Sequence, residues 1–155
     1  MKIHYWAILA CLFGVCAHAA PLAVGDAMPT IMANDQHGAG FTFTNGIQFL
    51  LVATERACAS TANHKLAEQG AGYLENHHAA YLMGIHTMPT VARWFAIPKM
   101  KKYPQRIVLV DSAKTLAAFP VQPGCVTVLV LTPAGRIQKI SYWNPSNQPV
   151  EGCFK

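Results

Sequence analysis

The stretch Phe49-Leu-Leu-Val-Ala-Thr-Glu-Arg-Ala-Cys58-Ala-Ser-Thr61 decides the fold, because an apolar run stops there and a single cysteine follows. The run predicts a buried strand, and the residues after it predict a short turn and a helix that Cys58 opens. The N-terminus of a helix carries unpaired N–H groups and partial positive charge, which stabilise a thiolate. Cys58 is therefore the first candidate nucleophile.

The residues around Cys58 leave two interpretations open. Three positions further on, where a Cys-x-x-Cys motif would place a second cysteine, the chain has Thr61. Arg56, two positions before Cys58, favours a thiolate and a reactive site. The alternative is a partly buried cysteine that packs as a small hydrophobe, with Thr61 as an ordinary residue of the first helical turn.

The N-terminal residues predict a secretory signal peptide over residues 1–19. A basic start at Lys2 precedes an apolar run over residues 7–15, and Ala17-His-Ala19 has the small residues of a cleavage site. Val15 before Cys16, and the short apolar stretch before Cys11, disfavour lipid attachment at either cysteine. We expect export, to the periplasm of a Gram-negative cell, and no membrane span after cleavage.

Residues 20–155 are expected to form one domain, since the chain has 155 residues, 52% of them hydrophobic, and no linker or repeat. Three cysteines remain after cleavage: Cys58, Cys125 and Cys153. An odd number leaves at least one thiol free, paired with another chain or used chemically. Export to an oxidising compartment allows one disulfide within the chain.

Apolar runs alternate with helical patterns along the chain, which predicts an α/β fold with a mixed sheet. Runs of apolar residues indicate strands, and residues 136–143 alternate like an edge strand. The expected elements are a hairpin over 30–43, strands over 47–53, 79–85, 106–110, 126–131 and 136–143, and helices over 58–75 and 89–97.

Four segments in this order resemble the thioredoxin-like superfamily, nearest its redoxin branch of peroxiredoxins and thiol-disulfide reductases. The resemblance implies a thioredoxin-like α/β sandwich, in which helices flank a central mixed β-sheet and an N-terminal β-hairpin precedes it. The segments are Val24-Gly25-Asp26 to Gly38, Phe49 to Cys58, Val108 to Val121, and Thr127 to Ile137.

The chain departs from that family at the positions that carry its chemistry. The place of the family's cis-proline is held by Val126, preceded by Cys125. A cis bond before a residue other than proline costs about 2.5–4 kcal/mol, so we expect a trans bond there. Glu55 stands where peroxiredoxins have Thr or Ser. The resemblance nevertheless places the Cys125 loop beside Cys58, as a non-local pair.

Two functional hypotheses follow from the resemblance and its departures. The first is an exported, redox-degenerate binding domain that contacts a periplasmic protein partner through loops such as Trp143-Asn-Pro145. The second is a thiol-based oxidoreductase or peroxidase-like enzyme, with Cys58 as nucleophile and Cys125 as resolving thiol. Cys153 is the odd thiol or an alternative partner. The sequence sets no oligomeric state.

A copper-handling protein is the least favoured hypothesis. Soft ligands for copper are dense over residues 77–88, where His77, His78, Met83, His86 and Met88 lie. No Cys-x-x-Cys or His-x-x-x-His spacing accompanies them, so we expect solvated histidines, a core Met83 and no bound metal or other cofactor.

Nucleic acid is not an expected partner either. The basic residues at 99–106 have no interleaved aromatic pattern and no known nucleic-acid motif, and indicate a solvated face. No glycine-rich phosphate loop or nucleophile elbow occurs, so nucleotide-binding and hydrolase functions have no support.

Overall fold

The computed structural model describes residues 20–43 and 46–155. The predicted signal peptide over residues 1–19, with Cys11 and Cys16, lies outside the described residues, so it stays a prediction. Within the described part of the chain, every helix is too short or too polar to cross a membrane.

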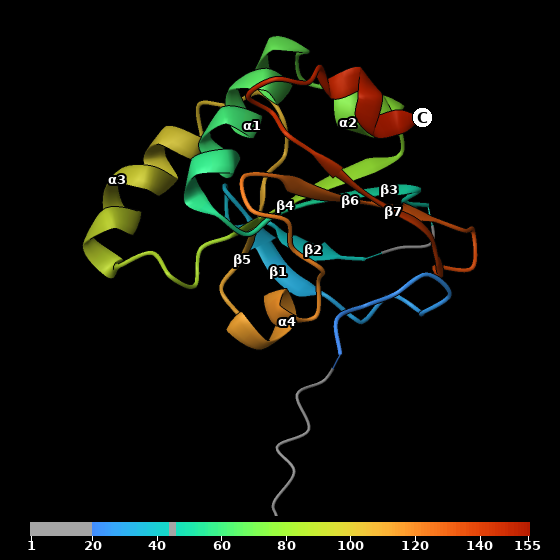
Figure 1. The fold of residues 1–155 in the computed structure, drawn as a ribbon. Coiled ribbons are helices and arrows are strands. Elements are labelled where there is room, and N and C mark those ends of the chain that lie inside the picture. The colour runs from blue at the N-terminus through green and yellow to red at the C-terminus, as the bar shows by residue number, and fades with distance from the viewer. Residues whose placement is uncertain (1–19, 44–45) are drawn as a thin grey trace, which may run out of the picture.

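The strands form a mixed sheet in the order β2-β1-β5-β4-β3-β6-β7 (Figure 1). The central pairs β3–β4 and β4–β5 are parallel, and the flanking pairs are antiparallel. The mixed sheet and the N-terminal hairpin formed by β1 and β2 are thereby confirmed. The strands are β1 Met32–Asp35, β2 Gly40–Thr42, β3 Phe49–Ala53, β4 Ala79–Gly84, β5 Val108–Val110, β6 Val126–Leu131 and β7 Ile137–Trp143.

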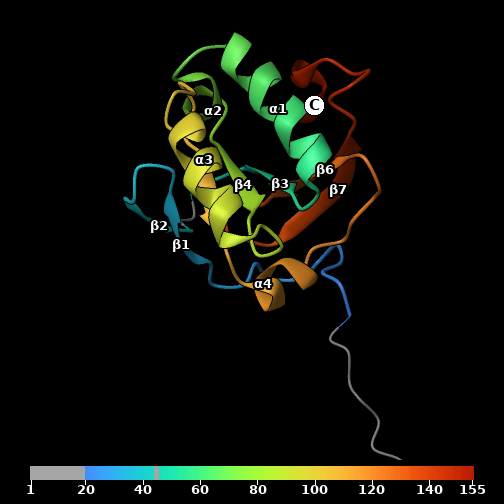
Figure 2. The ribbon, with the colours of Figure 1, turned by 90° about the vertical axis from the view of Figure 1, so that its left-hand side faces the viewer.

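Helices cover both faces of this sheet. One face carries α1, α2, α3 and the C-terminal 3₁₀ helix η1, while α4 lies on the other (Figures 1 and 2). This is the α/β sandwich expected from the pattern of apolar runs. The helices are α1 Arg56–Glu68, α2 Tyr73–Asn76, α3 Thr90–Met100, α4 Ala113–Ala117 and η1 Val150–Phe154.

Strand β3 shows why its apolar run has no polar face. Successive side chains of a strand point to opposite faces of the sheet. Leu51 and Ala53 join the core cluster beneath α1, whereas Leu50 and Val52 join the cluster on the other face. All four are buried, as a strand covered on both faces requires. This rigid strand sets the position of the residues that follow it.

Two helix predictions were wrong in their extent. The helix expected over 58–75 is two helices, because α1 ends at Glu68 and Gly70 adopts a φ of +90°, which breaks the helix. The helix expected to end before Pro98 continues to Met100. Pro98 removes one helical hydrogen bond in the last turn, and the burial of Met100 in the core stabilises that turn despite this loss.

Candidate functional site

The first turn of α1 carries Cys58 where the sequence predicted it. β3 ends at Ala53, Glu55 is the N-cap residue with an extended backbone, and Cys58 is the third residue of the helix. Its side chain is buried, with 4% of its surface exposed. Cys58 therefore lies at the helix N-terminus but is covered by protein.

The loop before β6 lies directly against this turn, so the predicted juxtaposition of Cys58 and Cys125 is confirmed. The Cys58 thiol donates to the carbonyl oxygen of Glu55 at 3.2 Å and to that of Cys125 at 3.5 Å. All peptide bonds of the described residues are trans, including the bond before Val126. Cys58 and Cys125 are both buried free thiols rather than a disulfide.

The surroundings of Cys58 favour its protonated form. Burial raises the pKa of the Cys58 thiol, and the charges of Glu55 and Cys125 add to this shift, while backbone hydrogen bonds with Glu55 and Ala59 offset it only in part. The two carbonyl oxygens accept the thiol hydrogen, and hydrogen bonds of this kind stabilise the neutral thiol. Only a thiolate attacks a disulfide or peroxide, so these surroundings oppose the reactive interpretation of Cys58.

Arg56 and Thr61, the other two candidate residues, do not reach the sulfur through any hydrogen bond of the described residues. The Arg56 side chain is exposed, and it is not among the main causes of the raised Cys58 pKa. The Thr61 hydroxyl donates to the carbonyl oxygen of Ala57 in the preceding turn at 3.4 Å. The latter contact is an ordinary one for threonine inside a helix.

Glu55 holds the two parts of the site together, a role that the sequence did not indicate. Its Oε2 accepts a hydrogen bond from the backbone N–H of Gly124 at 3.0 Å. Gly124 has a φ of +72°, a conformation that favours glycine. The carboxylate thus joins the start of α1 to the loop that carries Cys125. The proximity of the Glu55–Gly124 pair could be found only from the folded chain.

The third thiol lies on the same face of the sheet, in η1. Cys153 is buried and belongs to the same core cluster as Cys58 and Trp143. Burial raises the pKa of Cys153 to about 12, and Glu151 adds to the shift. Cys153 is therefore a packed core residue rather than an exposed odd thiol.

The loop expected to contact a partner is folded inward. Trp143 is only 3% exposed, and its Nε1 donates to the carbonyl oxygen of Gln148 at 3.1 Å. Pro145 is buried as well. The prediction that Trp143-Asn-Pro145 offers a contact surface was wrong, because the indole fills the core beneath η1.

The cavity beside the first turns of α1 does not include Cys58 in its lining. It has a volume of about 110 Å³ and is lined by Arg56, Ser60 and Asn63. The cavity also has the thioether side chains of Met83 and Met88 in its wall. The described residues hold no group of three His, Cys, Asp or Glu side chains close enough to bind a metal.

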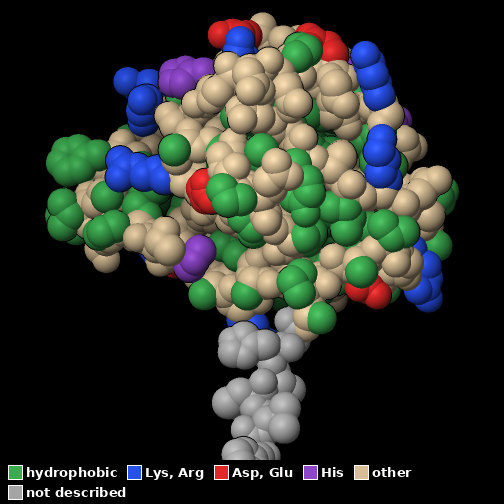
Figure 3. Space-filling model, in the orientation of Figure 1, with side chains coloured by type: hydrophobic (Ala, Val, Ile, Leu, Met, Phe, Trp, Pro, Cys, Tyr) green, Lys and Arg blue, Asp and Glu red, His purple; other side chains and the backbone are tan. Residues whose placement is uncertain are grey.

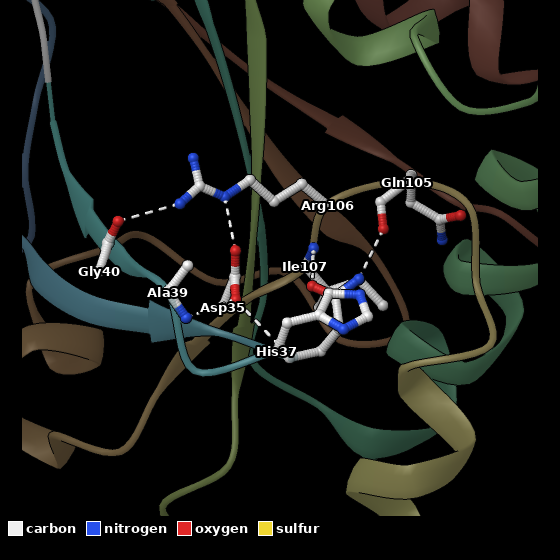
Figure 4. Close-up of polar contacts among 8 residues, drawn as sticks. Asp35, His37, Ala39, Gly40, Gln105, Arg106 and Ile107 are labelled. Atoms are coloured by element: carbon white, nitrogen blue, oxygen red, sulfur yellow. Dashed lines mark hydrogen bonds and ion pairs between the residues drawn. The ribbon is translucent and has the colours of Figure 1, made fainter.

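A polar cluster at the far side of the sheet is structural (Figure 4). The buried carboxylate of Asp35 accepts from the N–H groups of His37 and Ala39, both at 2.9 Å, and from Arg106 Nε at 3.0 Å. Arg106 also donates to the carbonyl oxygen of Gly40 at 3.0 Å. These contacts join the β1–β2 hairpin to the segment leading into β5.

We compared the chain with family models, curated proteins and solved structures. No family model matches the chain, and no curated protein does. Solved structures do match. The thioredoxin domain of a thiol-disulfide oxidoreductase from Bacteroides vulgatus is 18% identical with a TM-score of 0.54, covering 86% of this chain and 99% of that one. This chain has a thioredoxin-like fold.

Two further solved structures support the assignment to the thioredoxin-like fold. A peroxiredoxin-like protein from Aquifex aeolicus is 12% identical with a TM-score of 0.53, over 79% of this chain and 77% of that chain. A putative protein disulfide isomerase from Bacteroides thetaiotaomicron is 12% identical with a TM-score of 0.54, over 82% of each chain. These neighbours share the thioredoxin-like fold with this chain. At such identities the likeness covers the fold alone.

Proposed function

We propose that the protein is an exported thioredoxin-like domain that binds a partner and does not turn over thiols. The observation that carries the proposal is the state of Cys58, whose thiol is buried and donates to two backbone carbonyl oxygens. In the loop beside the thiol, the carbonyl oxygen of Cys125 and the backbone N–H of Gly124 are used for contacts within the chain.

Both the ionisation of the Cys58 thiol and its accessibility to another sulfur determine whether it can react. A thiol reacts with a disulfide when it is ionised and when the target sulfur can approach it in line. Burial and the Glu55 carboxylate raise the pKa of Cys58, which lowers the thiolate fraction at neutral pH. The Cys125 carbonyl and the Glu55–Gly124 hydrogen bond keep the neighbouring loop against the sulfur.

A thiol-disulfide oxidoreductase is the second candidate, and one observation favours it: Cys125 is next to Cys58 although 67 positions separate them. The Cys58 thiolate would attack a substrate disulfide, form a mixed disulfide and release one substrate thiolate. The Cys125 thiolate would then attack the Cys58 sulfur, release the second substrate thiolate and leave a Cys58–Cys125 disulfide. An external dithiol would reduce that disulfide.

Oxidation followed by thiol mapping separates the two candidates. The native protein is treated with diamide, its remaining thiols are alkylated, and peptides are identified by mass spectrometry. We expect Cys58, Cys125 and Cys153 to remain reduced, with no catalysed reduction of a disulfide substrate such as insulin. A reversible Cys58–Cys125 disulfide together with insulin reduction that Cys58→Ser abolishes would establish the enzyme instead. The unfolded protein, in which all three thiols should react, is the control for the reagent.

Export has its own test. When the full chain is expressed in a Gram-negative cell, we expect it in the periplasmic fraction with an N-terminus at or near Ala20, after the Ala17-His-Ala19 site. A cytoplasmic protein that retains residue 1 would contradict export while leaving the inert-thiol proposal intact.

A further inference from the structure

The outer side of α3 carries the largest exposed aromatic residues of the described chain. Val91, Trp94 and Phe95 are 62%, 70% and 76% exposed, and Pro98 is exposed too. Their spacing of three, one and three residues follows the helical period, so the four form one stripe along the helix. An amphipathic helix usually turns such a stripe toward the core. Here it faces solvent.

Contacts on the opposite side of α3 hold the helix in this orientation. Arg93 donates from Nε to the carbonyl oxygen of Met88 at 2.9 Å and from Nη2 to that of Ile85 at 3.0 Å. Arg93 also forms a bidentate ion pair with Asp111, in which Nη1 lies 2.6 Å from Oδ2 and Nη2 lies 2.7 Å from Oδ1. Met100 is buried in the core on the same side as Arg93. The stripe therefore cannot turn inward without breaking the Arg93 contacts.

Positive charge continues the stripe at its C-terminal end. Lys99, Lys101 and Lys102 are exposed: Lys99 lies in the last turn of α3, and Lys101 and Lys102 follow directly after its end at Met100. None of them forms an ion pair with another described residue. The sequence has no Asp or Glu over residues 76–110. In Figure 3, hydrophobic side chains gather over α3 at the left margin with Lys and Arg beside them.

We propose that this α3 face, made of Val91, Trp94, Phe95, Pro98 and the three lysines, binds the surface of an anionic phospholipid bilayer. Exposed aromatic side chains combined with lysines are the composition of helices that lie in the membrane interface. Lysines near an anionic surface each add about fivefold to binding. This inference goes beyond the proposed function and does not depend on the state of Cys58.

The shape of the face favours a bilayer over a protein. α3 stands at the outer margin of the molecule (Figure 1), and its aromatic side chains, Trp94 and Phe95, are mostly exposed. Projecting rings need matching pockets on a protein partner, whereas the headgroup region accepts any convex apolar surface. We expect α3 to lie flat, with Trp94 and Phe95 at the level of the upper acyl chains and the lysines among the phosphates.

The two tryptophans of the described residues make binding measurable. Trp94 is exposed and Trp143 is buried, so a change in fluorescence on binding reports Trp94. Protein is mixed with vesicles of phosphatidylcholine alone, or with about one third phosphatidylglycerol, and followed by fluorescence and co-sedimentation. We expect a blue shift and sedimentation with the anionic vesicles, reduced by salt, and little of either with neutral vesicles.

Matched variants assign the binding to α3. Trp94→Ser with Phe95→Ser should abolish co-sedimentation, and Lys99→Gln, Lys101→Gln and Lys102→Gln should each weaken it about fivefold. Val24→Ser and Val121→Ser remove exposed apolar side chains that do not line the hollow beside α3, and should change nothing. Circular dichroism and thermal melting show that each variant is folded. The N-terminus of the preparation is determined first, because residues 7–15 would themselves bind a bilayer if retained.

Three results would overturn the proposal. One is the absence of binding to anionic vesicles at low salt. Another is binding that survives the Trp94→Ser, Phe95→Ser change. The third is a Trp94 blue shift that grows with protein concentration without vesicles, since a second copy of the chain would then cover the face. Loss of the α3 proposal in any of these ways leaves the Cys58 measurements unaffected.

Discussion

The first turn of α1 and the outer side of α3 lie on the same face of the sheet, but they differ in how far their side chains are buried and hydrogen-bonded within the chain. At the first turn of α1, the thiol of Cys58 is buried and its hydrogen is bound by carbonyl oxygens of the chain itself. Along α3, Trp94 and Phe95 are mostly exposed and no described ion pair neutralises the adjoining lysines. In the first region, the Cys58 thiol has its hydrogen-bond partners within the chain. In the second region, the aromatic side chains and the lysines are exposed.

The contrast between the two regions indicates which surface of the molecule is available to other molecules. In thioredoxin-like proteins the helix N-terminus after the central strand is where chemistry is expected, and here the Cys58 thiol and the Glu55 carboxylate already have hydrogen-bond partners within the chain. Exposed apolar area on a monomer marks an interaction site more often than it marks a stable surface. We therefore assign recognition to α3 and a structural role to the Cys58 turn.

The strongest test of the comparison uses the two tryptophans. Trp143→Ala should lower the free energy of unfolding by about 3–5 kcal/mol, because it empties a packed core position and removes the hydrogen bond to Gln148. Trp94→Ala should change it by less than about 0.5 kcal/mol, since its side chain is mostly in water. Urea unfolding of both variants measures the difference. Similar losses in the two variants would mean that α3 is packed more tightly than described.

A second prediction concerns the polar cluster at the far edge, which should support the fold without affecting either region. Asp35→Ala removes the acceptor of three hydrogen bonds and should cost about 2 kcal/mol. Asp35→Asn keeps an acceptor oxygen and should cost less. Neither variant should change Cys58 alkylation, and a change there would show that the hairpin and the α1 turn are coupled.

The same residue predicts a pH dependence with a definite sign. Burial acts to raise the pKa of Asp35, but the N–H groups of His37 and Ala39 and the Arg106 guanidinium outweigh it, so the pKa is lowered. A lowered pKa in the folded state gives stability above the ordinary value of 3.8, which is lost as pH falls through the folded pKa. The stability difference between wild type and Asp35→Asn should therefore narrow below about pH 4.

Glu55→Ala should weaken the contact between the first turn of α1 and the loop that carries Cys125. The change frees the Gly124 N–H and removes a charge that raises the pKa of Cys58, so alkylation of Cys58 should become faster. We expect a stability loss of about 1 kcal/mol. Glu55→Gln, which keeps an acceptor for Gly124, separates the hydrogen bond from the charge. Unchanged alkylation in both variants would remove Glu55 from the account.

The smallest effects are expected at the other two candidate residues. Arg56 is exposed and Thr61 bonds within its own helix, so Arg56→Ala and Thr61→Val should leave the pH dependence of Cys58 alkylation unchanged. Both should alter stability by no more than about 0.5 kcal/mol. A clear shift of the alkylation profile in Arg56→Ala would restore the reactive interpretation of the site.

The sequence predicted most of the fold, because short, valine-rich apolar runs such as residues 126–131 favour strands that are buried on both faces. It also predicted that the Cys125 loop meets Cys58, since the order of motifs resembled a known topology. It did not predict η1 or the burial of Trp143, because a short C-terminal segment has no periodicity that separates packing from exposure.

The state of the site was beyond the sequence for a similar reason. Whether Cys58 is a thiolate depends on burial and on the direction of two carbonyl groups, which are properties of the folded backbone. The sequence also did not predict that Trp94 and Phe95 are exposed. A helical spacing of apolar residues predicts a buried face, and α3 instead anchors its other side through Arg93.

The most direct test of the inert-thiol account is the pH dependence of Cys58 alkylation in the native protein, followed by mass spectrometry of the Cys58 peptide. We expect Cys58 alkylation to be slower than in the unfolded chain, with a midpoint above the ordinary thiol pKa of about 8.5. A midpoint below that value, with native Cys58 reacting faster than the unfolded chain, would contradict the inert-thiol account.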